Sequence, residues 1–182
     1  MLEPLPQQAV FVTDRSQSFK NMIVVGQALR NQTGRSEFSV TARLGTSTLL
    51  SMNASALGQH PEAVLDTSIE VELNTLDQFC EENGIDRVSC MKINAKGSEL
   101  NIFKGAERML SEQRIDMIMF EWPATPHYED CTLLLNLWKE LDRQNYKKCN
   151  SFFFRSVRNG QRRFGNAVFI SDKFRKNNLP EL

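Results

Sequence analysis

The stretch Val88–Trp122 decides the fold of this chain, and it reads VSCMKINAKGSELNIFKGAERMLSEQRIDMIMFEW. Val88–Ile93 is a short apolar run with one lysine, the length of a buried strand, and Asp116–Glu121 is a second such run. Between them, apolar residues recur at helical spacing as far as Gln113, and Ser98 is a suitable helix N-cap. A strand, a helix and a second strand within about 35 residues form a βαβ unit, which places both strands in a parallel sheet.

Polar residues follow both strands of this predicted unit. Asn94 and Lys96 come directly after the first strand, and Glu121 lies at the end of the second. Parallel sheets bind ligands in the crevice at the carboxyl ends of their strands. The sequence therefore predicts a functional site around these three residues.

Composition limits the class of protein. The chain has 182 residues, enough for one domain, and its 22 Lys and Arg balance 22 Asp and Glu. Zero net charge argues against a broad surface for nucleic acid or anionic membrane, and no apolar run approaches the roughly 20 residues of a membrane span. The four cysteines lack paired short spacing and three lie in apolar stretches, so we expect buried thiols in a reducing, cytoplasmic compartment. With only two histidines, far apart in sequence, a histidine metal site is not expected.

Local patterns predict the remaining elements through apolar periodicity, helix caps and turn residues. We expect helices over 6–18 and 75–83 and after an N-cap at Asp130, strands over 22–29, 37–43, 68–73, 149–155 and 164–170, a loop over 45–61, a hairpin turn at 159–160 and a fraying polar end from 173. The helix over 75–83 begins with the capping box Thr75–Gln78. Capping is a sufficient explanation for that stretch, so we assign it no catalytic role.

Four groups of residues occur in the order and spacing of one enzyme family. They are Thr75–Asp77 (Thr-Leu-Asp), Lys92–Glu99 (Lys-Ile-Asn-Ala-Lys-Gly-Ser-Glu), Phe103–Ala106 (Phe-Lys-Gly-Ala) and Phe120–Glu121. Together they resemble the FkbM family of S-adenosylmethionine-dependent methyltransferases, whose main signature reads Lys-Ile-Asp-Val-Glu-Gly-Ala-Glu. The resemblance extends over nearly the whole chain from Leu2 onward.

The resemblance implies an α/β fold, with a Rossmann-like class I methyltransferase sheet, helices on both faces and an antiparallel C-terminal hairpin that closes the sheet. It implies S-adenosylmethionine as the cofactor and methyl transfer to a hydroxyl oxygen of a small molecule or sugar. The residues it assigns are Glu121 and Glu99 near the chemistry, Glu3 at the ribose hydroxyls, Gln27 and Ala28 at the adenine, and Asn94 near the charged part of the cofactor.

Two of these assignments have structural alternatives. Glu3 is also consistent with a solvated glutamate close to a terminus. Glu99 is also explained by the helix dipole, which favours an acid in the first turn. The sequence leaves both alternatives open.

The chain also departs from the family pattern. Asn94 and Lys96 replace an Asp and a Glu of the signature. Residues two apart in an extended segment point the same way, so both changes affect one face of the site. That face loses negative charge beside a cationic cofactor. None of the nine glycines forms the Gly-x-Gly turn that holds the methionine part of the cofactor. We therefore expect a truncated domain over 1–173, lacking the family's first strand and helix, and a polar tail over 174–182.

These departures support an alternative function for the isolated chain. In this alternative the protein is a truncated or degenerate family member that does not catalyse and serves as an interaction module. Cofactor binding by the chain alone is then doubtful. The unpaired sheet edges left by a missing strand carry backbone groups that need partners, and they predict a homo-oligomer joined through these edges.

Overall fold

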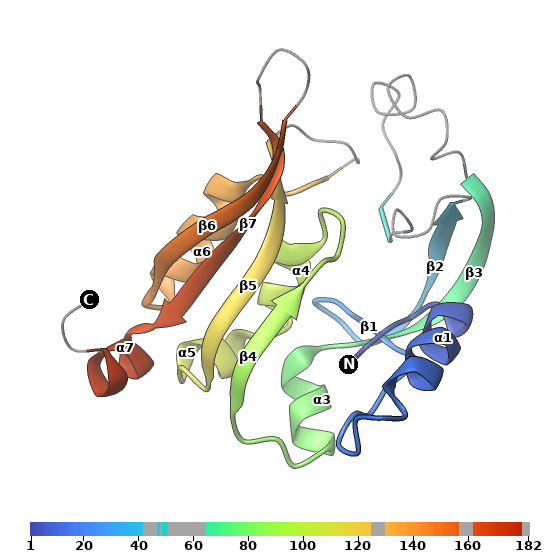
Figure 1. Cartoon of the computed structure of the whole chain (residues 1–182), viewed down its shortest axis with the longest axis horizontal. Coiled ribbons are helices and arrows are strands. Elements are labelled where there is room, and N and C mark those ends of the chain that lie inside the picture. The colour runs from blue at the N-terminus through green and yellow to red at the C-terminus, as the bar shows by residue number, and fades with distance from the viewer. Residues whose placement is uncertain (42–46, 48, 51–64, 125–129, 157–161, 180–182) are drawn as a thin grey trace.

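The strands of the chain form two separate sheets. The structure is a computed structural model, and it describes residues 1–41, 47, 49–50, 65–124, 130–156 and 162–179. The three-stranded sheet has the order β1 (Ala28–Leu29), β3 (Leu65–Asn74), β2 (Gly34–Thr41), and the four-stranded sheet has the order β4 (Val88–Ile93), β5 (Ile115–Pro123), β7 (Arg162–Ser171), β6 (Tyr146–Ser156) (Figure 1). The sequence predicts one sheet, so the division into two is a finding of the structure.

The βαβ unit expected at the centre of the chain is confirmed. β4 and β5 are parallel and in register from Val88 opposite Ile115 to Ile93 opposite Phe120. β7 then pairs antiparallel with both β5 and β6, as the expected C-terminal hairpin requires. β6 begins at Tyr146, three residues before the predicted strand, and the predicted turn at 159–160 lies outside the described residues.

The single helix expected from Ser98 to Gln113 is wrong, because two short helices occupy this stretch. They are α4 (Glu99–Lys104) and α5 (Glu107–Ser111), separated at Gly105. A Cβ atom at Gly105 would lie 2.0 Å from the backbone oxygen of Arg30. The helix therefore breaks where its backbone lies against the segment that follows β1.

The residue Asp77 stabilises the second of these helices. Its carboxylate accepts hydrogen bonds from the backbone N–H groups of Arg108 at 2.7 Å and Met109 at 2.9 Å. These N–H groups belong to the first turn of α5 and have no partner within the helix. The Thr-Leu-Asp stretch thus has a second structural role, because Asp77 caps a helix about 30 residues further along the chain.

The amino-terminal part contains one confirmed helix and one wrong strand. α1 (Pro6–Ser16) agrees with the predicted helix. Within the predicted strand over 22–29, only β1 is a strand, and Val25 makes a single parallel bridge to Leu2. The backbone turns there, because the N–H of Gln27 bonds to the oxygen of Val25 at 3.0 Å, and so it cannot run extended along a neighbour.

The middle of the chain follows the sequence closely. β2 and β3 are antiparallel, with Phe38 opposite Ile69, which confirms both predicted alternating strands. α3 (Leu76–Glu82) follows the N-cap Thr75, whose hydroxyl accepts the backbone N–H of Gln78 at 3.1 Å. The expected loop over 45–61 lies almost entirely outside the described residues.

Two expectations about the carboxyl-terminal part are wrong. α6 (Leu134–Arg143) has Leu133 as its N-cap, while Asp130 has a positive φ of 57° and caps nothing. The polar end expected to fray forms α7 (Asp172–Asn178). The Ser171 hydroxyl caps this helix, and ion pairs from the Asp172 carboxylate to the cations one turn later favour it.

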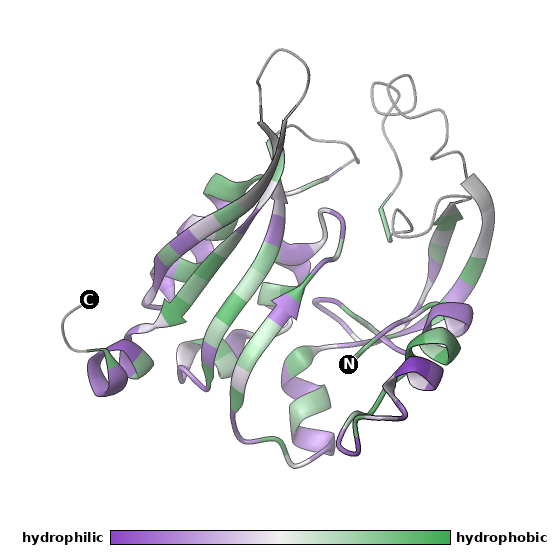
Figure 2. Cartoon of the chain, in the orientation of Figure 1, coloured by the Kyte–Doolittle hydropathy of each residue, from purple (hydrophilic) through white to green (hydrophobic). Residues whose placement is uncertain are grey.

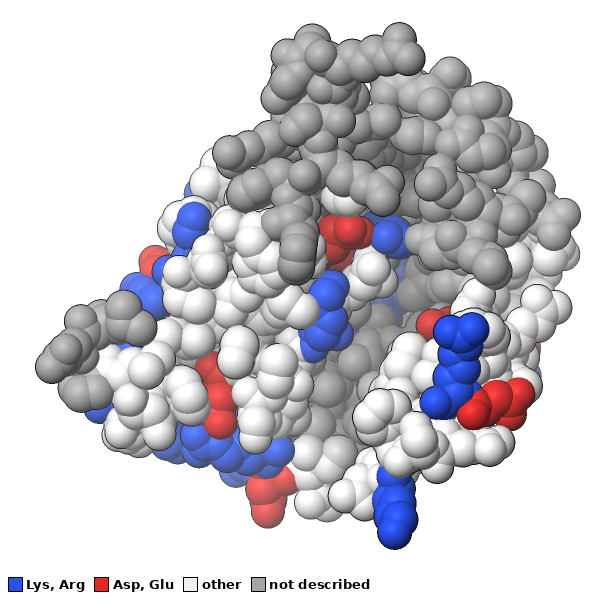
Figure 3. All heavy atoms as spheres, in the orientation of Figure 1, with Lys and Arg blue, Asp and Glu red and all other residues white. Residues whose placement is uncertain are grey.

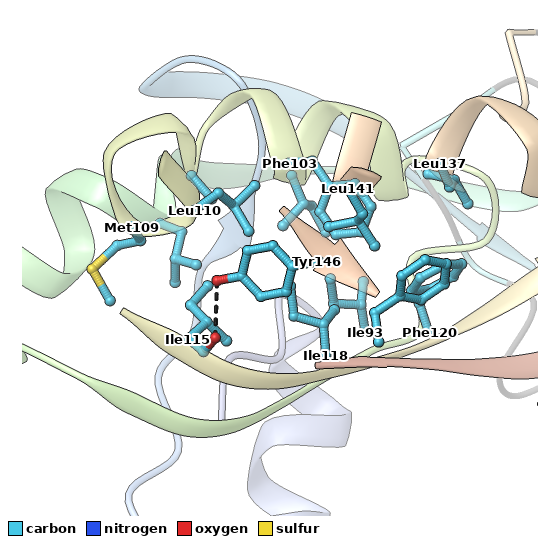
Figure 4. Packing of buried hydrophobic residues seen from close by; sticks show 14 of the residues in the cluster. Ile93, Phe103, Met109, Leu110, Ile115, Ile118, Phe120, Leu137, Leu141 and Tyr146 are labelled. Atoms are coloured by element: carbon cyan, nitrogen blue, oxygen red, sulfur yellow. Dashed lines mark hydrogen bonds between the residues drawn. The ribbon is translucent and has the colours of Figure 1, made fainter. Parts of the chain in front are cut away.

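The main core lies between the four-stranded sheet and the helices α3 to α6. Phe120 of β5 is stacked on Phe169 of β7 and meets the ring of Phe103 of α4 edge-on. The buried Tyr146 hydroxyl donates to the backbone oxygen of Ile115 at 2.9 Å, which satisfies the one polar atom of that side chain (Figure 4). A smaller core of Ala28, Phe38, Val71 and Leu73 supports the three-stranded sheet.

The helices α4, α5 and α6 lie on the same face of the four-stranded sheet (Figure 1). The expectation of helices on both faces is therefore wrong for the part of the chain that the structure describes. Hydrophobic residues, drawn in green, recur along β5 and β7 (Figure 2). This arrangement also corrects the cysteine prediction, because Cys90 on β4 and Cys149 on β6 are exposed and only Cys80 is fully buried.

The contact between Gly105 and Arg30 gives a stability test. We expect Gly105→Ala to lower the free energy of unfolding by about 1–3 kcal/mol, because the added methyl group meets a backbone oxygen that cannot rotate away. Gly26→Ala is the matched control, since nothing lies within 4 Å of its Cβ position. Urea unfolding of both variants measures the effect, and equal midpoints would show that the helix break does not depend on this contact.

The edge of β4 gives a second test. Among the described residues β4 pairs only with β5. The Val88 N–H donates to the backbone oxygen of Arg114, on the β5 side. Because the N–H groups of successive residues in a strand point to opposite sides, the Ser89 N–H points to the open edge. Open edges are templates for pairing with another chain.

We therefore expect light scattering after size-exclusion chromatography in reducing buffer to show an oligomer. Ser89→Pro removes one outward N–H and should shift the protein toward smaller species, whereas Ser89→Ala should not. A wild-type protein that remains monomeric at micromolar concentration would contradict the prediction.

Candidate functional site

The candidate site begins with a tight loop after β4, over residues 94–98. Lys96 has φ = 52° and Gly97 has φ = 103°, so two successive residues adopt left-handed backbone conformations. A Cβ atom at Gly97 would lie 2.7 Å from the Sγ of Cys131, and the Gly97 oxygen accepts the N–H of Thr132 at 3.2 Å. Glycine is required at 97 because of both the backbone angle and this close contact.

Glu99 holds the loop in this shape. Its two carboxylate oxygens accept the backbone N–H groups of Ala95 and Gly97, each at 2.9 Å. Glu99 is 1% exposed, and this burial raises the pKa of its carboxyl, an effect that the backbone N–H donors oppose. Ser98 is the N-cap residue of α4 as predicted, but its buried hydroxyl makes no hydrogen bond within the described residues.

An ion pair joins the loop to the end of β5. The Nζ of Lys96 lies 2.8 Å from Oε2 of Glu121, and both side chains are about four-fifths buried. The left-handed conformation of Lys96 belongs to the same loop that Glu99 fixes. The carboxyl ends of β4 and β5 are thus linked by opposite charges, and the Glu121 carboxylate already has a partner.

A second lysine lies at the end of β4. The Lys92 ammonium donates to the backbone oxygen of Ile93 at 2.9 Å. The pKa of Lys92 is lowered, chiefly by burial. The carboxylates of Glu121 and Glu99 oppose this shift, and the cation Lys96 adds to it. The four charged groups therefore form one interacting cluster.

The other assigned residues lie in two places. Asn94 is exposed at the end of β4, beside the cluster. Glu3 and Gln27 belong to the amino-terminal part, where the N–H groups of both residues bond to the oxygen of Val25 at 3.0 Å. Ala28 is 6% exposed, belongs to the smaller core and is paired with Leu73 of β3, so its side chain is not available to a ligand.

The molecule is hollowed between the part that contains β4 and the part that contains α1, and side chains of both charges occur along this hollow (Figure 3). Sequence reasoning named Glu99, Glu121 and Lys96, but it did not predict that Lys96 and Glu121 form an ion pair. The Lys96–Glu121 pair spans 25 positions, and the only signal for it is that both residues follow neighbouring parallel strands. The signals for Lys92 were its position inside an apolar run and its place as the first residue of the signature Lys92–Glu99.

Metal-binding clusters and membrane-spanning helices are both absent from the described residues. Among the residues that the structure describes, no group of three or more His, Cys, Asp or Glu side chains is placed to hold a metal ion. Within the same residues, no helix is long and apolar enough to cross a membrane.

Comparison with known proteins gives the class of this α/β protein. A family model for the methyltransferase FkbM domain matches residues 1–148, which is more than half of the chain. The chain therefore belongs to the FkbM methyltransferase family. No curated protein and no solved structure matches it.

The contacts of Glu99 add a third explanation, the hydrogen bonds to the loop, to the catalytic role and the helix dipole that the sequence left open. We expect Glu99→Gln to lower the free energy of unfolding by about 1–3 kcal/mol, because one of the two buried N–H groups loses its acceptor. Glu107→Gln is the matched control, since Glu107 is also a first-turn acid but is exposed on α5. Urea unfolding measures both, and equal losses would mean that the helix dipole alone explains Glu99.

Proposed function

We propose that this chain transfers a methyl group from S-adenosylmethionine to a hydroxyl oxygen of a small molecule or sugar. The observation that carries the proposal is the match to the FkbM methyltransferase domain over residues 1–148. It is supported by the charged cluster at the carboxyl ends of β4 and β5, which is where α/β sheets bind their ligands.

The amino-terminal residues suit the nucleoside part of the cofactor. When bound, S-adenosylmethionine supplies the methyl group that is transferred. One carboxylate oxygen of Glu3 accepts the N–H of Leu5 at 3.0 Å, and its second oxygen remains for a ribose diol. Gln27, which we assign to the adenine, lies on the segment next to Glu3, which we assign to the ribose. The two residues therefore lie close together, as adenine and ribose do in one nucleoside.

Glu121 is the residue we assign to the acceptor hydroxyl. Its carboxylate, which lies 2.8 Å from the Lys96 ammonium, is the group we assign to accept the proton that leaves the hydroxyl. Such a proton acceptor typically contributes 10²–10⁴-fold to a rate. Glu99 acts through the loop that carries Lys96, because both of its oxygens bind backbone N–H groups.

One observation favours the alternative of a non-catalytic interaction module. Both carboxylates of the cluster already have protein partners, and an acceptor must compete with Lys96 for Glu121. The open edge of β4 would then be the surface through which the module acts.

A methyl-transfer assay separates the two proposals. S-adenosylmethionine with a labelled methyl group is supplied at millimolar concentration, because the sequence has no Gly-x-Gly turn and binding should be weak. We expect the labelled methyl group to be transferred to hydroxyl acceptors. Glu121→Gln should lower kcat by about 10²–10⁴-fold, whereas Lys96→Met should retain most of it because the carboxylate remains. Glu107→Gln, far from the cluster, should leave the rate unchanged.

Each contrary result has one meaning. Equal losses in Glu121→Gln and Lys96→Met would show that only the ion pair matters and that Glu121 accepts no proton. No transfer, together with no cofactor binding in titration calorimetry at the same concentration, would favour the interaction module.

A further inference from the structure

Exposed apolar side chains gather in one short segment of the chain, residues 10–23, which we call the amino-terminal surface. Among the described residues, nine large apolar side chains are exposed, and five of them belong to this segment. They are Val10 (61%), Phe11 (52%), Phe19 (68%), Met22 (39%) and Ile23 (73%). Single exposed apolar residues are common on proteins, but a group of them marks an interaction surface.

The backbone keeps these side chains close together. Val10 and Phe11 lie on α1, and directly after the helix the N–H of Phe19 bonds to the oxygen of Ser16 at 2.7 Å. The N–H of Met22 then bonds to the oxygen of Phe19 at 3.2 Å, so the segment continues in successive turns. Ser16 is the one buried residue of α1, and the helix lies at the margin of the molecule (Figure 1). The surface is therefore available to a partner.

The charges of this surface are of both signs. Asp14, Arg15 and Lys20 are its charged residues, and all three are exposed. The guanidinium carbon of Arg15 lies 4.6 Å from the centre of the Phe11 ring, so this cation already has a contact within the helix. Neither Asp14 nor Lys20 forms an ion pair with another residue that the structure describes. One acid and one base thus remain for an interaction across an interface.

These charges favour a second copy of the chain over a membrane. A helix that binds anionic lipid carries many Lys and Arg residues, and this segment has two of them beside an acid. A two-fold interface between identical chains places the same surface on both sides. Each acid can then meet the base of the other copy, and Asp14 and Lys20 satisfy this condition.

We propose that the amino-terminal surface is the interface of a two-fold homodimer. The apolar side chains of one protomer pack on the same surface of the other, and Asp14 pairs with Lys20 of the partner subunit. Removal of apolar area from water drives the association, and the two ion pairs fix its orientation. The interface is separate from the open edge of β4, and it does not depend on the proposed methyl transfer.

Light scattering after size-exclusion chromatography tests the interface in the Ser89→Pro variant, in which pairing through β4 is weakened. We expect this variant to be a dimer, because its amino-terminal surface is unchanged. Adding Phe19→Ser and Ile23→Ser should raise the dissociation constant of the dimer at least about 100-fold, since four apolar side chains leave the interface. Leu135→Ser is the matched control, because Leu135 is 62% exposed but belongs to α6. The same substitutions are made without Ser89→Pro, so that a folding defect of that variant does not decide the result.

A charge exchange tests the assigned ion pair. Asp14→Lys should raise the dissociation constant about 10-fold, because two contacts between like charges replace two ion pairs. Adding Lys20→Asp to the same chain should restore most of the affinity, since opposite charges meet again. A loss without this recovery would overturn the pairing of Asp14 with Lys20.

The dimer itself is overturned by a monomeric Ser89→Pro protein at micromolar concentration that unfolds at the wild-type urea midpoint. It is also overturned if Leu135→Ser weakens association as much as Phe19→Ser with Ile23→Ser. A monomer that sediments with vesicles of phosphatidylcholine and phosphatidylserine, and no longer does so after Phe19→Ser with Ile23→Ser, would identify a lipid surface as the partner and overturn the dimer.

Discussion

The buried carboxylate of Glu99 is the constraint on which the site depends. A carboxylate that is 1% exposed is stable only if hydrogen bonds replace its lost hydration, and two backbone N–H groups of one loop do so. Those bonds hold a loop in which two successive residues, Lys96 and Gly97, adopt left-handed conformations. The loop in turn places the Lys96 side chain across the end of β5, where it meets Glu121. The hydrogen bonds of Glu99 therefore determine which charges lie together at the carboxyl ends of β4 and β5.

The same loop depends on the core beneath it. Glu99 begins α4, and the Phe103 ring of this helix packs edge-on against Phe120 of β5. Phe120 is adjacent to Glu121 in β5, and Phe103 lies in the helix that Glu99 begins. The packing of these two rings therefore positions both Glu99 and Glu121. The helices α4, α5 and α6 that support this arrangement cover one face of the four-stranded sheet, and β4 pairs only with β5 in the part of the chain that the structure describes. The site is thus packed against the core on its β5 side, and the other edge of β4 has no strand partner among the described residues.

The sequence predicted those parts of the structure whose cause is local. The apolar runs of β4 and β5, the alternation of β2 and β3 and the capping box at Thr75 are all confirmed. The failures arise from contacts between distant residues. Periodicity cannot show that Gly105 meets the backbone of Arg30, so one long helix was predicted in place of two. In the site, Glu121 and Glu99 could be named from their positions, but the pairing of Glu121 with Lys96 depends on the register of two strands.

That pairing changes what Lys96 does to a cationic cofactor. A lone cation about 5 Å from a sulfonium costs roughly 3 kcal/mol at an effective dielectric of about 20. Glu121 lies 2.8 Å from Lys96, and a carboxylate about 7 Å from the sulfonium returns about 2 kcal/mol of that cost. The family signature has Glu where this chain has Lys96, and an acid there beside an unchanged Glu121 would bring two like charges together. Lys96 and Glu121 are therefore best understood as one unit whose charge is nearly neutral, so the substitution at 96 is less adverse to the cofactor than the sequence suggests.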